Sequence, residues 1–185
     1  MSGKIKLIIG GMCAGKTSMM LNDVERYYIS KKKCLIIKHT QDTRYEHIAK
    51  LQGIVTNNLI EHTKFDSITT STLSLMDEIV ELYDVIGITE LQFYNDPEYI
   101  DNWANNGKII ICDALDGDSN RQIFGQLGKV IPLCEEIIKL RAVCMICGGD
   151  ASFTKKNKIS VQDSQVDIGG LDKYTPVCRK CYFTN

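Results

Sequence analysis

The sequence lacks the features that mark several broad classes of protein. Its 22 lysines and arginines nearly balance its 23 aspartates and glutamates, so the net charge is −1. Such a chain has no overall field that would attract nucleic acid or an anionic membrane, and we expect neither as a partner. The apolar run after Met1 is too short for a signal peptide or a membrane span, which predicts a cytoplasmic protein.

Internal repeats, low-complexity tracts and flexible linkers are also missing, whereas the hydrophobic content of 44% is ordinary for a globular core. Helical patterns alternate with short apolar segments that are typical of buried strands, at residues 5–9, 34–38, 84–88 and 108–112. This alternation predicts an α/β fold with a mostly parallel sheet covered on both faces. After about residue 140, cysteine pairs, glycines and polar residues replace the pattern. We therefore expect an α/β domain in residues 1–140 and a small second module in residues 141–185.

Two of the helical patterns give specific predictions. Residues 71–83 read as one amphipathic helix. The side chains expected to face inward from it are Leu75, Ile79, Leu82 and Tyr83. Residues 96–107 have the punctuation of a second helix, with Asp96 as its cap, Pro97 in its first turn and Gly107 at its exit.

The segment GGMCAGKT matches the phosphate-binding pattern G-x-x-x-x-G-K-[ST] between an expected strand and an expected helix. Its glycines let backbone N–H groups turn toward phosphate oxygens, and the helix N-terminus adds partial positive charge. Lys16 can reach the β- and γ-phosphates, and the Thr17 hydroxyl can bind Mg²⁺. The segment predicts a site for ATP and Mg²⁺, and the alternative is a glycine-rich turn with a chance lysine. The residues expected at the nucleotide are Gly10, Gly11, Met12, Cys13, Ala14, Gly15, Lys16 and Thr17.

The eight cysteines fall into two groups. Most of the scattered ones are expected to pack as small apolar residues: Cys13, Cys34, Cys112 and Cys134. The others form two C-x-x-C pairs separated by about thirty residues, Cys144 with Cys147 and Cys178 with Cys181. Four thiolates suit a closed, tetrahedral, structural Zn²⁺ site, and the alternatives are two redox pairs or packed free thiols. Zinc at both ends would hold the enclosed segment, residues 166–174, as a lid.

Taken together, these segments resemble the type II thymidine kinases, a compact family found in animals, many bacteria and large DNA viruses. The resemblance covers nearly the whole chain. It depends on an ordered set of motifs: GGMCAGKT, KCLIIKHTQDTRY, VIGITELQFY, ALDGDSNRQIFG, AVCMICGGDASFTKK and IGGLDKYTPVCRKCYF. It implies a RecA-like P-loop core, a zinc-held lasso over the nucleoside, a homotetramer, feedback inhibition by dTTP, and phosphoryl transfer from ATP to the 5′-hydroxyl of thymidine.

The resemblance also assigns roles to single residues. Glu90 would be the general base, Lys16 would hold the phosphates, and Arg44 would stabilise charge on the transferred group. Asp42 would order its loop or the waters of the metal. Thr89 and Gln92 would lie at the cofactor. The residues implied at the nucleoside are Met12, Phe93, Leu115, Ser119, Phe124, Thr154, Val166, Asp167, Ile168, Gly169 and Tyr174.

The chain departs from the family pattern at several positions. The family has aspartate before the glutamate, where this chain has the uncharged Thr89. Loss of one outer-shell partner of a metal typically lowers metal affinity or activity by about 10- to 100-fold. Asp113 stands where a small apolar residue is usual, and we hypothesise that it lies near the phosphates and replaces some of the missing charge. Ser119 replaces an aromatic residue that packs on the base, which predicts weaker stacking and a roomier pocket. Leu91 replaces a small residue and is expected to narrow the cleft.

Three functions follow for comparison. The first is an active deoxynucleoside kinase, and the second is a catalytically weakened relative that binds nucleotides or dTTP. The third is a P-loop ATPase with a nucleic-acid-binding zinc ribbon, against which the near-neutral charge and the glycine-bearing lasso argue.

Overall fold

The computed structural model describes residues 2–41, 65–157 and 169–184. Its main sheet has the strand order β3-β2-β4-β5-β1-β6, and every neighbouring pair is parallel. The predicted parallel α/β fold is therefore confirmed. The strands are β1 (Lys4–Gly10), β2 (Cys34–His39), β3 (Asp66–Thr70), β4 (Val85–Ile88), β5 (Ile109–Leu115) and β6 (Glu136–Leu140).

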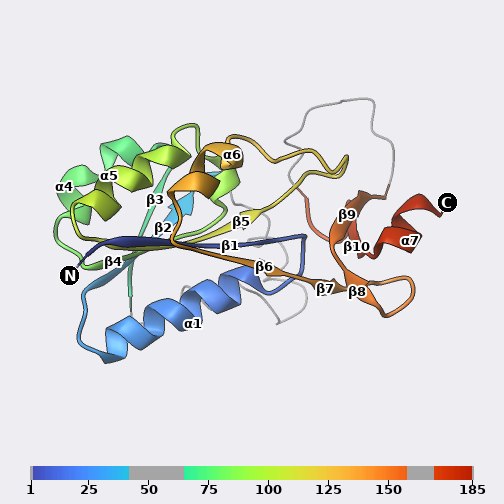
Figure 1. Cartoon of the computed structure of the whole chain (residues 1–185), viewed down its shortest axis with the longest axis horizontal. Helices are drawn as coiled ribbons and strands as arrows, with labels where there is room; N and C mark the ends of the chain where they lie inside the picture. The colour runs from blue at the N-terminus through green and yellow to red at the C-terminus, as the bar shows by residue number, and fades with distance from the viewer. Residues whose placement is uncertain (1, 42–64, 158–168, 185) are drawn as a thin grey trace.

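Helices cover both faces of this sheet. Helix α1 (Lys16–Ile29) lies along one face, and α4 (Asp77–Val80), α5 (Ile100–Asn105) and α6 (Leu127–Val130) lie over the other (Figure 1). Each face has its own buried apolar cluster, one with the side chains of α1 and the other with those of the shorter helices. Single 3-10 turns connect these elements: Leu73–Leu75, Leu91–Phe93, Pro97–Tyr99 and Ile131–Leu133.

The four predicted strands are confirmed as β1, β2, β4 and β5, while β3 and β6 were not predicted. Both of these are edge strands with mostly exposed or half-exposed residues. An edge strand is not buried on both faces, so it needs no continuous apolar run. The sequence signal used for the central strands is therefore missing from them.

The single amphipathic helix predicted for residues 71–83 is wrong. The segment forms the 3-10 turn Leu73–Leu75 and then the short helix α4. Leu75 and Leu82 are 73% and 65% exposed, whereas Leu73 and Val80 are buried. The change from 3-10 to α geometry at Met76 shifts the phase of the repeat, so a single helical period misassigns the inward face. The inward placement of Ile79 and Tyr83 is correct, because both pack against the core.

The break in this segment is stabilised by Asp96. Its carboxylate oxygens accept hydrogen bonds from the backbone N–H groups of Leu73 at 3.1 Å and Ser74 at 2.9 Å. Asp96 was predicted to cap its own helix, but its side chain makes no capping bond there. The predicted exit at Gly107 is confirmed, since this residue has a φ of 87° and follows the end of α5.

The residues after 140 form a small module beyond the carboxyl ends of the sheet strands (Figure 1). Strands β7 (Ala142–Val143) and β8 (Asp150–Ala151) pair antiparallel, as do β9 (Phe153–Lys156) and β10 (Tyr174–Val177). Helix α7 (Arg179–Phe183) follows them. The module has its own buried cluster, although its status as a separate domain stays a prediction.

Across the described ranges, we find no helix with the length and apolar character needed to span a bilayer.

We predict that mild acid destabilises the fold through His39. This residue ends β2, is 5% exposed, lies edge-on to Tyr94 at 4.7 Å and accepts the Gln41 N–H at Nδ1. Burial lowers the pKa of His39. The folded protein therefore holds the imidazole neutral, while the unfolded chain takes up a proton below about pH 6.5. This part of the stability is present above that pH and is lost as the pH falls.

The measurement is the urea midpoint of wild type and His39→Gln at intervals from pH 7.5 to pH 5.5. The wild-type midpoint should fall more steeply than that of the variant. If the urea midpoints of the two proteins fall in parallel with pH, His39 is not the cause of the acid destabilisation.

Candidate active site

The loop between β1 and α1 has the shape that its motif predicts. Gly15 has a φ of 82°, a left-handed conformation that glycine adopts without a Cβ penalty. A Cβ at Gly10 would lie 2.5 Å from the carbonyl oxygen of Leu140, so the backbone passes too close to β6 for a side chain. Lys16 is 7% exposed, and its Nζ donates to the carbonyl of Gly11 at 3.0 Å. The curled loop and its buried lysine thus stand at the carboxyl end of β1, beside the helix N-terminus.

The scattered cysteines behave largely as expected. Cys34 and Cys112 are buried and Cys134 is half-buried. Cys13 differs, because it is exposed on the phosphate loop with a φ of 61°.

The end of β4 holds Glu90 in a strained position. Glu90 is 7% exposed, and its φ of 53° and ψ of 48° are uncommon for a residue with a side chain. Gln92 Nε2 donates to Glu90 Oε2 at 2.5 Å, and Gln92 Oε1 accepts the Leu115 N–H at 2.9 Å. This carboxylate is therefore fixed by both its backbone and its neighbours. Backbone strain of this kind concentrates at functional sites.

Asp113 lies in β5 next to this strand end. It is fully buried, and its Oδ1 accepts the Glu90 N–H at 2.7 Å. Burial, followed by the charge of Glu90, raises the pKa of Asp113 to about 6, while the charge of Lys16 and the side chain of Thr17 act to lower it. The hypothesis that Asp113 lies near the phosphate loop is confirmed. Its effect on magnesium stays a prediction.

Two departures from the family pattern have different structural outcomes. Thr89 is 1% exposed, and its hydroxyl has no hydrogen-bond partner among the described residues. Leu91 is fully buried in the core beneath α4 and α5. The expectation that Leu91 narrows the cleft is therefore wrong, because its side chain points into the protein core.

An apolar wall lies beside Glu90. Met12, Leu115 and Phe124 form one buried cluster, and Phe93 and Tyr174 pack against it. The rings of Phe93 and Phe124 meet edge to face at 5.8 Å, an arrangement that aromatic pairs favour. These five predicted substrate residues come from five separate segments of the chain, and the fold brings them together.

Ser119 lies in the loop after β5, and the module reaches it through Tyr182. The Tyr182 hydroxyl donates to the carbonyl oxygen of Ser119 at 2.7 Å. Arg121, two residues further on, lies over the rings of Tyr182 and Phe183, each at 4.7 Å. The loop that includes the predicted base contact is therefore attached to α7.

Thr154 joins the module to the phosphate loop. Its hydroxyl accepts the Met12 N–H at 3.1 Å, and the residue is 6% exposed. Figure 1 shows the same juxtaposition, with β9 and β10 next to the turn between β1 and α1. Thr154 was predicted to contact the nucleoside, and that contact stays a prediction. The structure shows its hydrogen bond with the Met12 N–H.

Gly169 is half-exposed in the segment that leads to β10. Five predicted site residues lie outside the described part of the chain: Asp42, Arg44, Val166, Asp167 and Ile168.

The two cysteine pairs converge. The sulfur atoms of Cys144, Cys147, Cys178 and Cys181 all lie within 4.8 Å of one another. A tetrahedral Zn–S site with 2.3 Å bonds needs sulfur separations of about 3.8 Å. Cys147 and Cys178 are 3.7 Å apart. Although burial acts to raise the pKa of Cys144, backbone N–H groups around it lower that pKa to about 6, which favours the thiolate that binds metal. The cluster therefore fits Zn²⁺.

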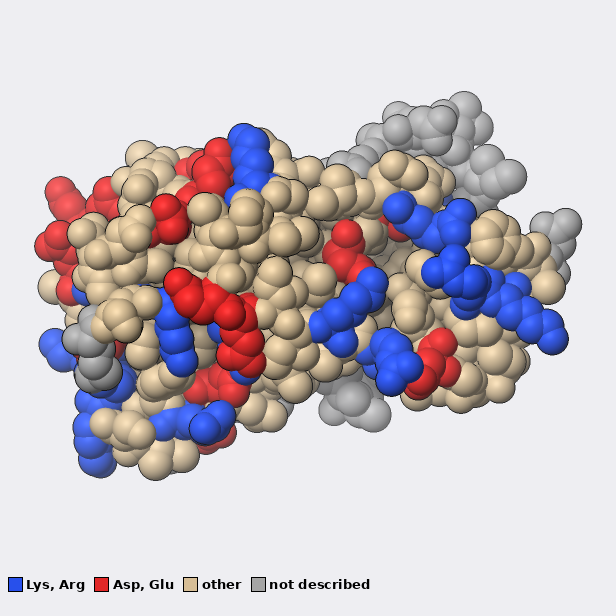
Figure 2. Space-filling view, in the orientation of Figure 1, with Lys and Arg blue, Asp and Glu red and all other residues tan. Residues whose placement is uncertain are grey.

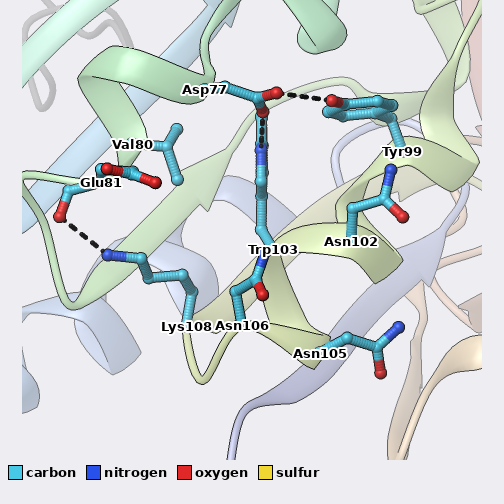
Figure 3. A pocket seen from close by; sticks show the side chains of 9 residues that line it. All are labelled: Asp77, Val80, Glu81, Tyr99, Asn102, Trp103, Asn105, Asn106 and Lys108. Carbon is cyan, nitrogen blue, oxygen red and sulfur yellow. Dashed lines mark hydrogen bonds between the residues drawn. The ribbon is translucent and has the colours of Figure 1, made fainter.

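A pocket also lies on the sheet domain, away from the phosphate loop and the cysteine cluster. A pocket of about 580 Å³ lies between α4 and α5, by Lys108 at the amino end of β5 (Figure 3). Asp77 in it accepts hydrogen bonds from Tyr99 Oη and Trp103 Nε1, and Lys108 Nζ donates to the carbonyl of Glu81. Its main polar groups therefore bond one another, and the pocket is at the opposite end of β5 from Leu115.

Charge is unevenly distributed over the face drawn in Figure 2. Both signs alternate over the sheet domain, while lysine and arginine side chains gather over the module. One arginine of the module, Arg179, is stacked on an aromatic ring, since it lies 4.9 Å from the ring centre of Phe153.

Sequence reasoning missed the contacts of two residues at this site. Tyr182 was not singled out, although it follows Cys181 of the four-cysteine cluster and bonds the loop of Ser119. Gln92 was expected at the cofactor, but its amide is engaged by Glu90 and Leu115, and a cofactor contact stays a prediction. The sequence signal for the Gln92 contact is its position two residues after Glu90, the residue assigned as general base.

Comparison with known proteins gives consistent matches. The family model for thymidine kinase matches residues 3–182. A thymidine kinase of Myxoma virus (strain Lausanne) is 42% identical over 184 residues, covering 98% of this chain and 97% of the relative. That of Amsacta moorei entomopoxvirus is 43% identical, covering 96% and 97%. Thymidine kinase 1 of Dictyostelium discoideum is 40% identical, covering 98% of this chain and 78% of its own length.

We predict that Thr154→Val weakens the connection between module and loop. Valine keeps the shape of threonine but leaves the Met12 N–H without its acceptor, and an unpaired buried donor costs about 1–3 kcal/mol. Thr154→Ser keeps the hydroxyl and is the matched control. The urea midpoint should fall for valine and stay near wild type for serine. Equal midpoints for the two variants would contradict this role.

Proposed function

The chain belongs to the thymidine kinase family, and we propose that it transfers the γ-phosphoryl group of ATP to the 5′-hydroxyl group of thymidine. One observation supports this most strongly: Glu90 is bonded to Asp113, whose pKa the phosphate-loop Lys16 lowers, and to Gln92, which bonds Leu115 of the apolar wall. The Glu90 N–H donates to Asp113, and the Glu90 carboxylate accepts from the Gln92 amide. A base in that position can reach both a phosphate donor and a nucleoside hydroxyl.

In this proposal each described residue has a physical task. The backbone of the phosphate loop and Lys16 hold the phosphates of ATP. Glu90 accepts the proton of the 5′-hydroxyl as that oxygen bonds the γ-phosphorus, the bond from this phosphorus to the β–γ bridging oxygen breaks, and ADP leaves. The fixed geometry of Glu90 lowers the entropy cost of positioning. The side chains of Met12, Leu115 and Phe124 contact the nucleobase of thymidine through their apolar surfaces. The Thr17 hydroxyl would hold Mg²⁺, which would supply positive charge that neutralises the phosphates.

Several further assignments rest on the family resemblance. We propose that Arg44 stabilises charge on the transferred group and that Asp42 orders its loop. We also propose that the segment from Val166 to Gly169 closes over the nucleoside. A homotetramer, feedback inhibition by dTTP and a cytoplasmic location are proposals on the same basis.

The base preference is open to test at Ser119. A serine offers no aromatic face for a base to stack on, and we propose that the pocket accepts deoxyuridine as well as thymidine. The experiment is a nucleoside-dependent ATP turnover assay with thymidine, deoxyuridine and deoxycytidine across a magnesium titration. Transfer to thymidine supports the kinase. Nucleotide binding without transfer to any nucleoside, by folded and zinc-loaded protein, supports the weakened relative, which the uncharged Thr89 motivates.

We predict that Glu90→Gln lowers kcat by about 10²- to 10⁴-fold, because glutamine has similar size but accepts no proton. Binding of ATP, followed by calorimetry, should change little, since the phosphate loop is intact. Glu78→Gln is the matched control, an exposed glutamate on α4. A Glu90→Gln enzyme with wild-type kcat would exclude Glu90 as the base.

We propose that the four-cysteine cluster binds one structural Zn²⁺ per chain. Four protein ligands leave no position for a substrate, so the ion would stabilise the module and take no part in the transfer. Thr154 and Tyr182 would transmit that stability to the phosphate loop and to the loop of Ser119.

The zinc prediction is tested with Cys147→Ser, since Cys147 is the exposed member of the cluster. Metal analysis should give about one zinc per wild-type chain, because one tetrahedral site uses all four thiolates. The variant should contain little zinc and melt at a lower temperature. Cys134→Ser, outside the cluster, should keep its zinc. A metal-free wild-type protein with an unchanged melting temperature would contradict the proposal.

A further inference from the structure

Asp113 has an unusual environment for a carboxylate. It is completely buried in the central part of the sheet, between β4 and β1. Its Oδ1 accepts the Glu90 N–H, but its Oδ2 is buried and has no partner of normal hydrogen-bond geometry among the described residues. A buried, unpaired carboxylate oxygen is costly unless a donor or a cation meets it. The site is therefore incomplete around this atom.

A second unpaired oxygen lies just after the end of the neighbouring strand, β4. Strands β4 and β5 are paired in parallel up to Ile88 and Cys112, and Thr89 and Asp113 are the next residues of each. The Thr89 hydroxyl is also buried and has no partner within the described ranges. Two neighbouring positions, Thr89 after β4 and Asp113 in β5, thus present oxygen atoms with unused bonding capacity, and only Asp113 brings a negative charge.

The environment of Asp113 connects these oxygens with the phosphate loop. The Thr17 side chain approaches the Asp113 carboxylate, and Lys16 is close enough to act on its charge. A Thr17 hydroxyl that donated to this carboxylate would keep its lone pairs directed away from it, available to a cation. Outer-shell carboxylates of this kind orient metal ligands and strengthen metal binding.

We propose that Asp113 is the acidic positioning residue of the magnesium site, where it orients the Thr17 hydroxyl and supplies the outer-shell charge that the neutral Thr89 does not. The same carboxylate also positions Glu90, the proposed general base, because it accepts the Glu90 N–H. Metal and base would therefore be fixed by the two oxygens of one side chain, which lies on β5 and not at the end of β4. The inference rests on the proposed nucleotide site.

The test separates these two tasks with Asp113→Asn. Asparagine keeps an oxygen that can accept the Glu90 N–H but loses the charge, whereas Asp113→Ala loses both. The probe is Mn²⁺ in the presence of ADP, with binding followed by electron paramagnetic resonance. We expect Asp113→Asn to weaken Mn²⁺ binding by about 10- to 100-fold. Asp101→Asn on α5, where the carboxylate accepts a hydrogen bond from the Asn105 side chain, is the matched control and should bind as wild type.

The double variant Thr89→Asp with Asp113→Asn provides the rescue. It moves the carboxylate to the adjacent strand position at unchanged net charge, and we expect its Mn²⁺ affinity to return to within a few-fold of wild type. This variant also tests the inference if Asp113→Asn alone does not fold. A folded double variant that binds Mn²⁺ as weakly as Asp113→Asn would overturn the charge argument.

Wild-type Mn²⁺ affinity in Asp113→Asn, with activity lost only in Asp113→Ala, would likewise overturn the metal role and leave Asp113 as a support for Glu90 alone. Failure of the proposed function has a different signature. A wild-type protein that transfers no phosphoryl group to thymidine, yet loses Mn²⁺ affinity in Asp113→Asn, would refute the kinase and support the inference.

Discussion

The hydrogen bond from the Glu90 N–H to Asp113 Oδ1 determines much of the site. Glu90 has a left-handed backbone, which a residue with a Cβ adopts at a cost, so its surroundings must supply compensating interactions. Asp113 provides one at the backbone, and Gln92 provides another at the carboxylate. The sharp turn after β4 then directs Gln92 toward Leu115 and buries Leu91 in the core.

The rest of the site is assembled around this turn by the parallel sheet. Because every strand ends at the same edge, the phosphate loop after β1, the turn after β4 and the end of β5 are neighbours in space. The module reaches this edge from beyond the strand ends, with Thr154 against Met12 and Tyr174 against the apolar wall. Residues far apart in sequence therefore meet at one edge of the sheet.

The parts predicted from the sequence are those with a local physical signal. The central strands have apolar runs because both of their faces are buried, and the phosphate loop and the C-x-x-C pairs have fixed spacing. The edge strands β3 and β6 lack such a run, and the segment 71–83 changes helix type at Met76, which no single period describes. The Asp113–Glu90 bond spans 23 residues and depends on strand order. The family resemblance supplied the pocket residues, and it could not show that Leu91 faces the core.

The bond between Thr154 and Met12 has a thermodynamic consequence. It joins a strand of the cysteine module to the backbone of the phosphate loop. If zinc orders the first and a nucleotide orders the second, the two binding equilibria are linked, and linkage is reciprocal. A chain with its nucleotide bound would then release zinc less readily, by the same factor by which zinc tightens the nucleotide. The rate of zinc release would thus depend on whether the nucleotide site is occupied, although zinc takes no part in the chemistry there.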